Sequence, residues 1–307
     1  MQVSRFVFPR GTVDATVAAL AQAERDGFAA AWMPQVLGWD PLTVLALAAR
    51  ETTTLRLGTA VVPTHPIHPL LLAASALTTQ SASGGRFALG IGISHRFLVE
   101  DVWGYRYEQP VAWIRDYLAA LQPALRGERP DVHTPRLTAA PPGPLEAPGT
   151  EAPAVLLAAM GPRMLATAGE LTDGTLTWLV GNGTLAAHIV PSIRAAAEAA
   201  GRPAPRVVAG LPVCVTSDPA AARDRARRKY GRYTNVPAYR AMLDREGVAE
   251  AGDVALIGDE ARVREQLAEL AAAGVTELKA EIFGTDAECE RAVACLCEQA
   301  GALAAAS

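Results

Sequence analysis

The sequence predicts a single α/β domain that folds as a (β/α)8 TIM barrel. Short β-rich runs alternate with helical runs from one end of the chain to the other, as they do in a parallel barrel. The 307 residues suit a barrel of about 250 residues with loop insertions. The competing fold, a doubly wound sheet, needs a G-x-G-x-x-G turn after its first strand, and the sequence has none there.

Eight short runs rich in strand-favouring residues predict the strands of this barrel. Each run is followed by a helical pattern or a long excursion, which is the order that a barrel requires. The predicted strands cover residues 3–8, 29–33, 55–62, 86–91, 155–159, 174–178, 207–215 and 277–283.

Several predicted helices carry start and stop signals. Asp40 and Asp218 each precede a proline, which places an N-cap side chain before a proline at the first helical position. Asp259 begins another helix, and Gly274 follows that helix as the expected C-terminal glycine. The last predicted helix opens with a capping box formed by Thr285 and the glutamate three residues later.

Two stretches interrupt the alternation within the single domain, which spans residues 1–307. Residues 127–153 carry a run of prolines, which predicts an inserted or extended loop. Residues 231–253 are polar and predict a second insertion loop. Long loops over a barrel often act as lids, so both segments are expected to shape the substrate pocket.

The composition is that of a globular protein with a large core, because half of the residues are hydrophobic and a fifth are charged. The net charge of −4 disfavours a nucleic-acid partner. No apolar run is long enough for a signal peptide or a membrane span, which predicts a cytoplasmic protein. The cysteines form no C-x-x-C pair and are expected to be reduced structural thiols; they are Cys214, Cys289, Cys295 and Cys297.

Chemistry in this fold gathers at the carboxyl ends of the strands. Those ends are poor in charge and rich in glycine, alanine, threonine, valine and tryptophan. They offer no paired carboxylates, no nucleophile motif and no cluster of metal ligands, so no metal site is predicted. The pattern favours a broad apolar pocket in which backbone groups hold a flat cofactor.

The stretch "AAMGPRML", residues 158–165, adds a candidate anion site. Gly161 permits close approach to the backbone, and Pro162 fits the first turn of a helix whose free N–H groups suit a phosphate. A plain strand-to-helix turn would give the same pattern, so the residues alone leave both interpretations open.

Segments along nearly the whole chain combine in a specific order and spacing. They include "AERDGFAAAWMPQ", "TTTLRLGTAVVPTHPIHP", "SGGRFALGIGISHRFLVEDVWGYRYEQP" and "LLAAMGPRMLATAGELTDGTLTW". In this combination the chain resembles the luciferase-like monooxygenase superfamily, in the branch that uses the deazaflavin coenzyme F420. The resemblance implies a TIM barrel of the bacterial-luciferase type, commonly a homodimer, that binds flavin or deazaflavin at its C-terminal mouth.

The resemblance also implies cofactor contacts at three strand ends. Ala60 and Val61 match the bulge after the third strand that supports the back face of the ring, often through a non-proline cis peptide. The fourth strand end and the phosphate-binding stretch supply the other implied contacts, which are Gly92, Ile93, Ser94, Ala158, Ala159 and Gly161. On this interpretation the strand in "RFALGIGISH" ends in small residues because a cofactor lies against it.

Two positions depart from the pattern of the family's sugar-phosphate dehydrogenases. Where those enzymes have an aspartate–histidine pair after the second strand, this chain has Pro34 and Gln35. Where they have an acidic residue after the fourth strand, it has His95. Because glutamine cannot act as a general base, oxidation of glucose 6-phosphate is disfavoured, and Gln35 is instead a candidate cofactor contact. Trp39 does match a family tryptophan beside the substrate.

The remaining candidates each have a structural alternative. His95 is the predicted catalytic acid or base, and its alternative is a histidine that is hydrogen-bonded at the barrel rim. Trp39, Trp178 and His65 are predicted substrate contacts. Their alternatives are core packing for Trp178 and a solvent-exposed, loop-shaping role for His65 together with His68.

The sequence thus predicts an F420-dependent oxidoreductase that transfers a hydride between the deazaflavin and a small organic substrate. With no strong base in view, reduction of an activated C=C or C=N bond is favoured, with His95 supplying the proton. The basic run at 223–233 would suit the polyglutamate tail of the coenzyme, or it forms a solvated helix face. The alternatives are an FMN-dependent monooxygenase that uses reduced flavin and O2, and a non-catalytic flavin-binding barrel.

Overall fold

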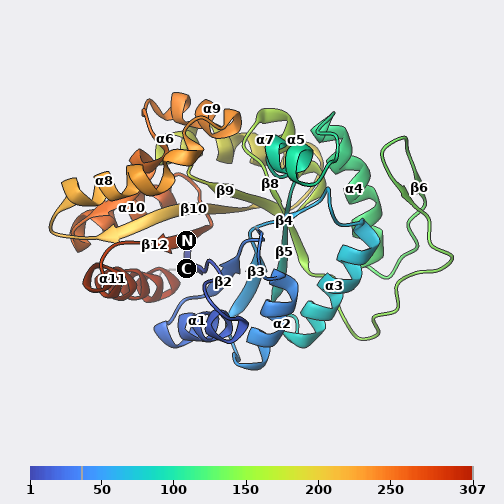
Figure 1. Cartoon of the computed structure of the whole chain (residues 1–307), viewed down its shortest axis with the longest axis horizontal. Coiled ribbons are helices and arrows are strands. Elements are labelled where there is room, and N and C mark those ends of the chain that lie inside the picture. The colour runs from blue at the N-terminus through green and yellow to red at the C-terminus, as the bar shows by residue number, and fades with distance from the viewer. Residues whose placement is uncertain (36, 306–307) are drawn as a thin grey trace.

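A computed structural model describes residues 1–35 and 37–305, and it confirms the predicted barrel (Figure 1). Eight parallel strands close on themselves, because the first strand pairs with the second on one side and with the last on the other. Each strand overlaps one predicted strand. In order around the barrel they are β1 (Gln2–Phe6), β2 (Ala30–Met33), β3 (Arg56–Thr59), β5 (Phe87–Gly92), β8 (Ala154–Ala158), β9 (Gly174–Trp178), β10 (Arg206–Val215) and β12 (Glu277–Ile282).

Two short strands join this sheet outside the ring of eight. β4 (Val62–Pro63) follows β3 after a two-residue interruption and pairs with the end of β5. β11 (Leu256–Gly258) pairs with the last residues of β10. Both lie toward the carboxyl ends of the strands they join, which is the end where the site is expected.

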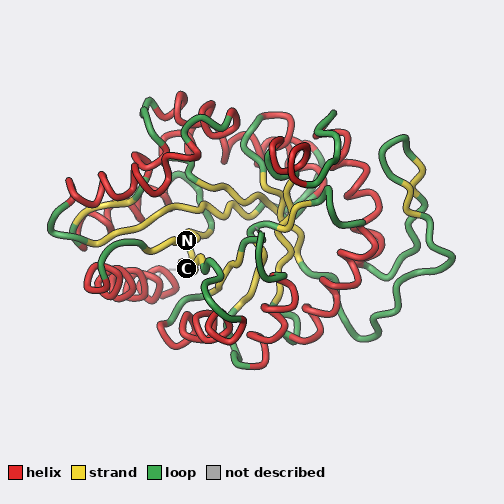
Figure 2. The backbone as a smooth tube through the Cα atoms, viewed as in Figure 1, coloured by secondary structure: helices red, strands yellow, loops and turns green. Residues whose placement is uncertain are grey.

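Helices surround the strands, as Figure 2 shows, and they bury a continuous apolar layer against the outside of the barrel. The predicted caps at Asp40, Asp218 and Asp259 are confirmed, since each carboxylate accepts a backbone N–H bond of 2.8 to 3.1 Å. Gly274 has a φ of +91°, as the predicted helix end requires. The main helices are α1 (Val13–Asp26), α2 (Pro41–Arg50), α3 (Pro69–Ala82), α4 (Pro110–Leu125), α5 (Pro162–Leu171), α7 (Val190–Ala199), α8 (Pro219–Tyr230), α10 (Glu260–Ala272) and α11 (Asp286–Ala305). Within the described ranges, none of the helices is long and apolar enough to cross a membrane.

The interior of the barrel is filled at its amino-terminal end. Trp32 packs against Gly58, where an added Cβ would lie 2.4 Å from the indole ring. The indole Nε1 donates to the buried carboxylate of Glu277 at 2.6 Å. Arg206 and Arg56 approach the same carboxylate, at 3.0 and 3.7 Å. This buried charge is therefore paired and hydrogen-bonded.

The first insertion, residues 127–153, is mainly loop, as predicted, and it projects from one side of the barrel in Figure 1. It contains a short antiparallel hairpin, β6 (Val132–His133) with β7 (Thr138–Ala139). His68 attaches this hairpin to α3, because its Nε2 lies 3.0 Å from the carbonyl oxygen of Thr138.

The second predicted loop, residues 231–253, is mostly helical. It contains α9 (Pro237–Glu246), flanked by the 3-10 turns η3 (Gly231–Tyr233) and η4 (Ala251–Val254). A proline at the first position of α9 and Gly247 at its end, with a φ of +76°, fix the limits of that helix. The buried face of α9 consists of Tyr239, Met242 and Leu243. The packing of this apolar face stabilises the helix although the segment as a whole is polar.

Candidate active site

The third strand is interrupted where the resemblance places a bulge. After β3, the peptide bond between Ala60 and Val61 is cis, as the sequence comparison implied. The backbone N–H of Ala60 donates to Met33, and the carbonyl of Val61 accepts from Gln35 at 3.3 Å. These bonds connect the bulge to the end of β2, so the ends of two neighbouring strands form one surface.

Three of the predicted cofactor contacts meet at the mouth of the barrel. A Cβ added to Gly92 would lie 2.8 Å from Cγ2 of Val61 and 3.2 Å from Cβ of Ala158. These three residues come from the ends of β3, β5 and β8, and we call them the small-residue surface. Because no large side chain rises from it, this surface can lie close to a flat ring.

Gln35 brings an unpaired polar atom to the same region. Its side-chain Oε1 is buried and has no hydrogen-bond partner among the described residues. Buried carbonyl groups are rarely left without a donor, so the atom fits a bound group that carries an N–H. The small-residue surface and this acceptor together fit a flavin or deazaflavin ring.

The turn after β8 has the form expected of a phosphate site. Gly161 is the N-cap of α5, with Pro162 as the first helical residue, and no side chain in the described part of the protein caps the helix. The backbone N–H groups of the first turn are therefore available to an anion. Ala159 is buried beside this turn, and Ser94 enters the loop after β5 with a φ of +64°. Ile93 directly follows Gly92 of the small-residue surface in the sequence and precedes Ser94.

His95 lies in an aromatic environment that includes the second insertion. Its ring stacks on Phe97, with 5.9 Å between centroids and 4° between planes, and lies 5.8 Å from the ring of Tyr239. Burial lowers the pKa of His95, because the charged imidazolium loses hydration there. Sequence analysis does not place Tyr239 in the site, because it predicts a loop where α9 lies.

The two histidines of "PTHPIHP" lie in different environments. His65 is buried, which corrects the expectation of a solvent-exposed pair. Its ring stacks on Trp113 at 4.8 Å and on Tyr107 at 5.9 Å, and burial lowers its pKa. Nδ1 of His65 is also buried and has no hydrogen-bond partner within residues 1–35 and 37–305, and the role of His65 as a substrate contact stays a prediction. His68 instead accepts the N–H of Leu70 at the start of α3.

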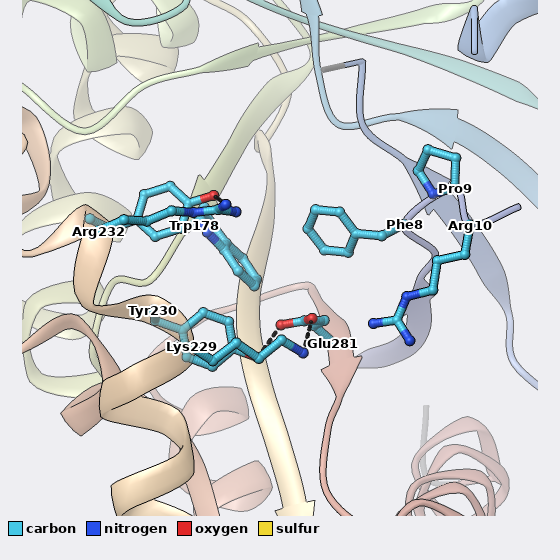
Figure 3. Close-up of a pocket in the computed structure, with 9 residues that line it drawn as sticks. Phe8, Pro9, Arg10, Trp178, Lys229, Tyr230, Arg232 and Glu281 are labelled. Carbon is cyan, nitrogen blue, oxygen red and sulfur yellow. Dashed lines mark hydrogen bonds and ion pairs between the residues drawn. The ribbon is translucent and has the colours of Figure 1, made fainter. Parts of the chain in front are cut away.

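The two predicted substrate tryptophans occupy different positions. Trp39 is 46% exposed, and its Nε1 donates to the carbonyl of Gly11 at 3.0 Å. Trp178, at the end of β9, lies 5.3 Å from the ring of Phe6 and lines a pocket at the barrel mouth (Figure 3). The pocket also contains Glu281, which sequence reasoning missed.

A signal for Glu281 was present in the sequence "ELKAEIF". In a strand, alternate residues share a face, so Glu277, Lys279 and Glu281 lie on one face of β12. That face is the interior one, because Nζ of Lys279 lies 3.9 Å from the ring centroid of Phe6 and 5.7 Å from that of Trp178. Burial lowers the pKa of Lys279 to about 7.

The basic run at 223–233 divides between structural pairs and the pocket. Arg225 pairs with Glu288 at 2.7 Å, and Arg227 with Asp253 at 2.8 Å, so these two arginines join neighbouring elements. Lys229 and Arg232 line the pocket instead. Among the described residues, no group of three or more histidine, cysteine or acidic side chains could hold a metal ion.

The four cysteines make a different, structural set. Cys214 and Cys295 are buried, while Cys289 and Cys297 are partly buried. Burial raises the pKa of all four thiols, and that of Cys297 rises to about 11. A raised pKa keeps a thiol protonated and unreactive, so these groups are poor candidates for a nucleophile.

The closed barrel of eight parallel strands agrees with the comparison with known families. Residues 1–277 match the family model described as luciferase-like monooxygenase. The chain belongs to the luciferase-like monooxygenase family.

A curated relative and two solved structures indicate the range of this family. A Mycobacterium tuberculosis protein, provisionally named as a coenzyme F420-dependent oxidoreductase, is 32% identical over 176 residues, covering 51% of this chain and 49% of that protein. Curated relatives are matched over 46% to 69% of their own length. An F420-dependent secondary alcohol dehydrogenase bound to an F420–acetone adduct superimposes with a TM-score of 0.82 at 16% identity, over 97% of both chains.

An FMN enzyme has nearly the same fold. The oxygenating constituent of 3,6-diketocamphane monooxygenase from Pseudomonas putida, in complex with FMN, gives a TM-score of 0.80 at 17% identity. It covers 98% of this chain and 97% of its own. Likeness at this level establishes the barrel and leaves the choice between F420 and FMN to other observations.

Proposed function

We propose that this oxidoreductase uses coenzyme F420 and reduces an activated C=C or C=N bond of a small organic substrate. The observation that carries the proposal is the small-residue surface of Val61, Gly92 and Ala158 beside the unpaired Oε1 of Gln35. A sequence relative that is 32% identical over 51% of this chain is named for F420. When bound, the deazaflavin supplies or accepts a hydride at carbon.

The chain's own residues would position the coenzyme and exclude water. The small-residue surface supports one face of the ring, and Oε1 of Gln35 accepts a hydrogen bond from its edge. The uncapped first turn of α5, at Gly161, offers backbone N–H groups to the phosphate. Aromatic side chains around Trp178 make the facing wall of the mouth apolar.

His95 would supply the proton in this proposal. Because burial lowers its pKa below the ordinary 6.5, the ring is mostly neutral at pH 7 and its imidazolium form is a stronger acid. The reductive rate should therefore fall as the pH rises through that lowered pKa. His95→Gln should slow turnover with reduced F420 and flatten this profile, while leaving the affinity for F420 unchanged.

FMN-dependent monooxygenation is the second candidate, because the luciferase-like family also includes monooxygenases and the same barrel holds FMN in the P. putida enzyme. Titrating the protein with F420 and, separately, with FMN, while following tryptophan fluorescence, tests the two. Tight binding of F420 with weak binding of FMN supports the proposal. Preference for FMN, with O2-dependent turnover of reduced flavin, would overturn it.

A further inference from the structure

The pocket at the barrel mouth has a volume of about 250 Å³. Its walls come from the ends of β1, β9 and β12 and from the segment where α8 passes into η3. In the view of Figure 3, Phe8 and Arg10 lie on one side, Trp178 and Arg232 on the other, and Glu281 between them. This volume suits a ligand smaller than a drug-sized molecule, of one or two rings.

The apolar walls of the pocket are aromatic. Trp178 meets Tyr230 and Tyr233 edge to face, with centroids 6.0 and 6.5 Å apart. Phe8 lies 6.4 Å from the same indole. Rings held in fixed tilted pairs offer flat apolar surfaces, which favour a planar ligand over a flexible one.

The polar groups of the pocket carry an excess of positive charge. Its one acidic side chain, Glu281, accepts hydrogen bonds from Lys229 at 2.7 Å and from the hydroxyl of Tyr230, so its charge is already balanced. Arg10 and Arg232 also line the pocket, and among the described residues neither pairs with a carboxylate. In a chain with a net charge of −4, this local excess is free to act on a ligand.

The placement of lysine supports the same conclusion. Lys229 and Lys279 are the only lysines in the chain, whose other basic residues are arginines and histidines. Lys229 lines the pocket, and Lys279 lies in the barrel interior beside Trp178, which is also a pocket wall. Lys229 thus pairs with the acid of this pocket, and Lys279 lies behind one of its walls.

We propose that this pocket binds a planar conjugated carboxylate, with its ring against Trp178 and Phe8 and its anionic end toward Arg10 and Arg232. The planar guanidinium fork matches a carboxylate better than a compact ammonium does. That the bound anion is the substrate to be reduced rests on the proposed function. The binding preference itself does not require the coenzyme.

Calorimetric titration with trans-cinnamate, its neutral amide and the saturated anion 3-cyclohexylpropanoate tests this proposal. We expect cinnamate to bind about tenfold or more tightly than either analogue, since hydrogen bonds to a charged group are worth more than neutral ones. Arg10→Gln and Arg232→Gln should each weaken cinnamate binding by a similar factor. Arg228→Gln removes an exposed positive charge from α8, four residues from Arg232 and outside the pocket lining, and should leave the affinity unchanged.

Acetylation of Lys229 gives a second readout that a change in folding would not imitate. Saturating cinnamate should slow its modification by an amine-reactive acetyl ester, as measured by peptide mass spectrometry, and the amide should not. Equal affinity for cinnamate and its amide, equal affinity for the saturated acid, or no loss in either arginine variant would overturn the proposal. Titration of the same samples with F420 distinguishes failure of this proposal from failure of the proposed function. If cinnamate binds and F420 does not, the proposed function is wrong and the carboxylate pocket is retained.

Discussion

Gly92 lies at a point of the barrel mouth that has little room for a side chain. A methyl group there would approach Cγ2 of Val61 to 2.8 Å and Cβ of Ala158 to 3.2 Å, so Val61 would have to move. Gly92→Ala should therefore disturb the small-residue surface and raise the Kd for F420 about tenfold, which corresponds to a packing cost of 1 to 3 kcal/mol. Fluorescence titration with F420 measures the change.

Gly143→Ala is the matched control, because a Cβ at Gly143 would have no neighbour within 4 Å. It should leave both the Kd and the melting temperature unchanged. If Gly92→Ala lowered the melting temperature but bound F420 like the parent protein, the small-residue surface would be a packing feature and the cofactor assignment at Gly92 would be wrong.

At the residue scale, small side chains at strand ends were predictable and partners across the barrel were not. Gly92 and Ala158 stand out because glycine and alanine at the end of an apolar strand leave space. The pairing of Glu281 with Lys229 joins residues 52 positions apart, and nothing local in either segment specifies it. Only the closure of the barrel brings them together.

At the scale of elements, helix α9 places the ring of Tyr239 beside His95, which lies on the loop after β5. The ring of Tyr239 lies 5.8 Å from that of His95, and burial lowers the pKa of this histidine. Tyr239→Ser opens that side to water and should raise the pKa of His95 toward its ordinary value of 6.5. Carbon-detected NMR titration of labelled histidines measures the shift.

Tyr105→Ser provides the comparison, since Tyr105 is 46% exposed. It should leave the titration of His95 as it is in the parent protein. An unchanged pKa in Tyr239→Ser would mean that α9 does not shield His95, and the lowered pKa would then have to come from Phe97 and the loop itself.

Helices and strands were predicted where a hydrophobic repeat or a capping residue marks them. They were missed where a helix is stabilised by burying its apolar residues against a segment far away in the sequence. The eight strands and the caps at Asp40, Asp218 and Asp259 have local signals. Helix α9 also has them, in Pro237 and Gly247, but its polar composition hid the few apolar residues that dock it. Short helices owe their stability mainly to such packing, which one sequence shows poorly.

At the scale of the whole molecule, the barrel carries charged groups through its interior. Glu277 lies at the amino-terminal end with two arginines, Lys279 lies above it among aromatic rings, and Glu281 lies at the mouth. Each of these charged groups needs a polar partner inside the barrel, and burying each charge costs free energy of desolvation. The stability of the entire fold should therefore depend on how these groups titrate.

Lys279 gives that dependence a definite sign. Burial lowers its pKa to about 7 from an ordinary 10.5, so between these values the unfolded chain binds the proton and the folded chain does not. The free energy of unfolding should accordingly rise with pH from about 7 toward 10. Lys279→Met removes the titration and should stabilise the protein by about 1 to 3 kcal/mol at pH 7, and by less at pH 9.5.

Urea unfolding at the two pH values measures this difference. Leu278→Met, on the same strand but facing the helices, introduces the same side chain without removing a charge, and its effect should be the same at both values. A stability gain for Lys279→Met that does not shrink at pH 9.5 would mean that Lys279 stays protonated in the folded protein across this range, and its lowered pKa would be wrong. Because the strand that carries Lys279 closes the barrel against β1, its titration would be felt in global unfolding rather than in a local opening.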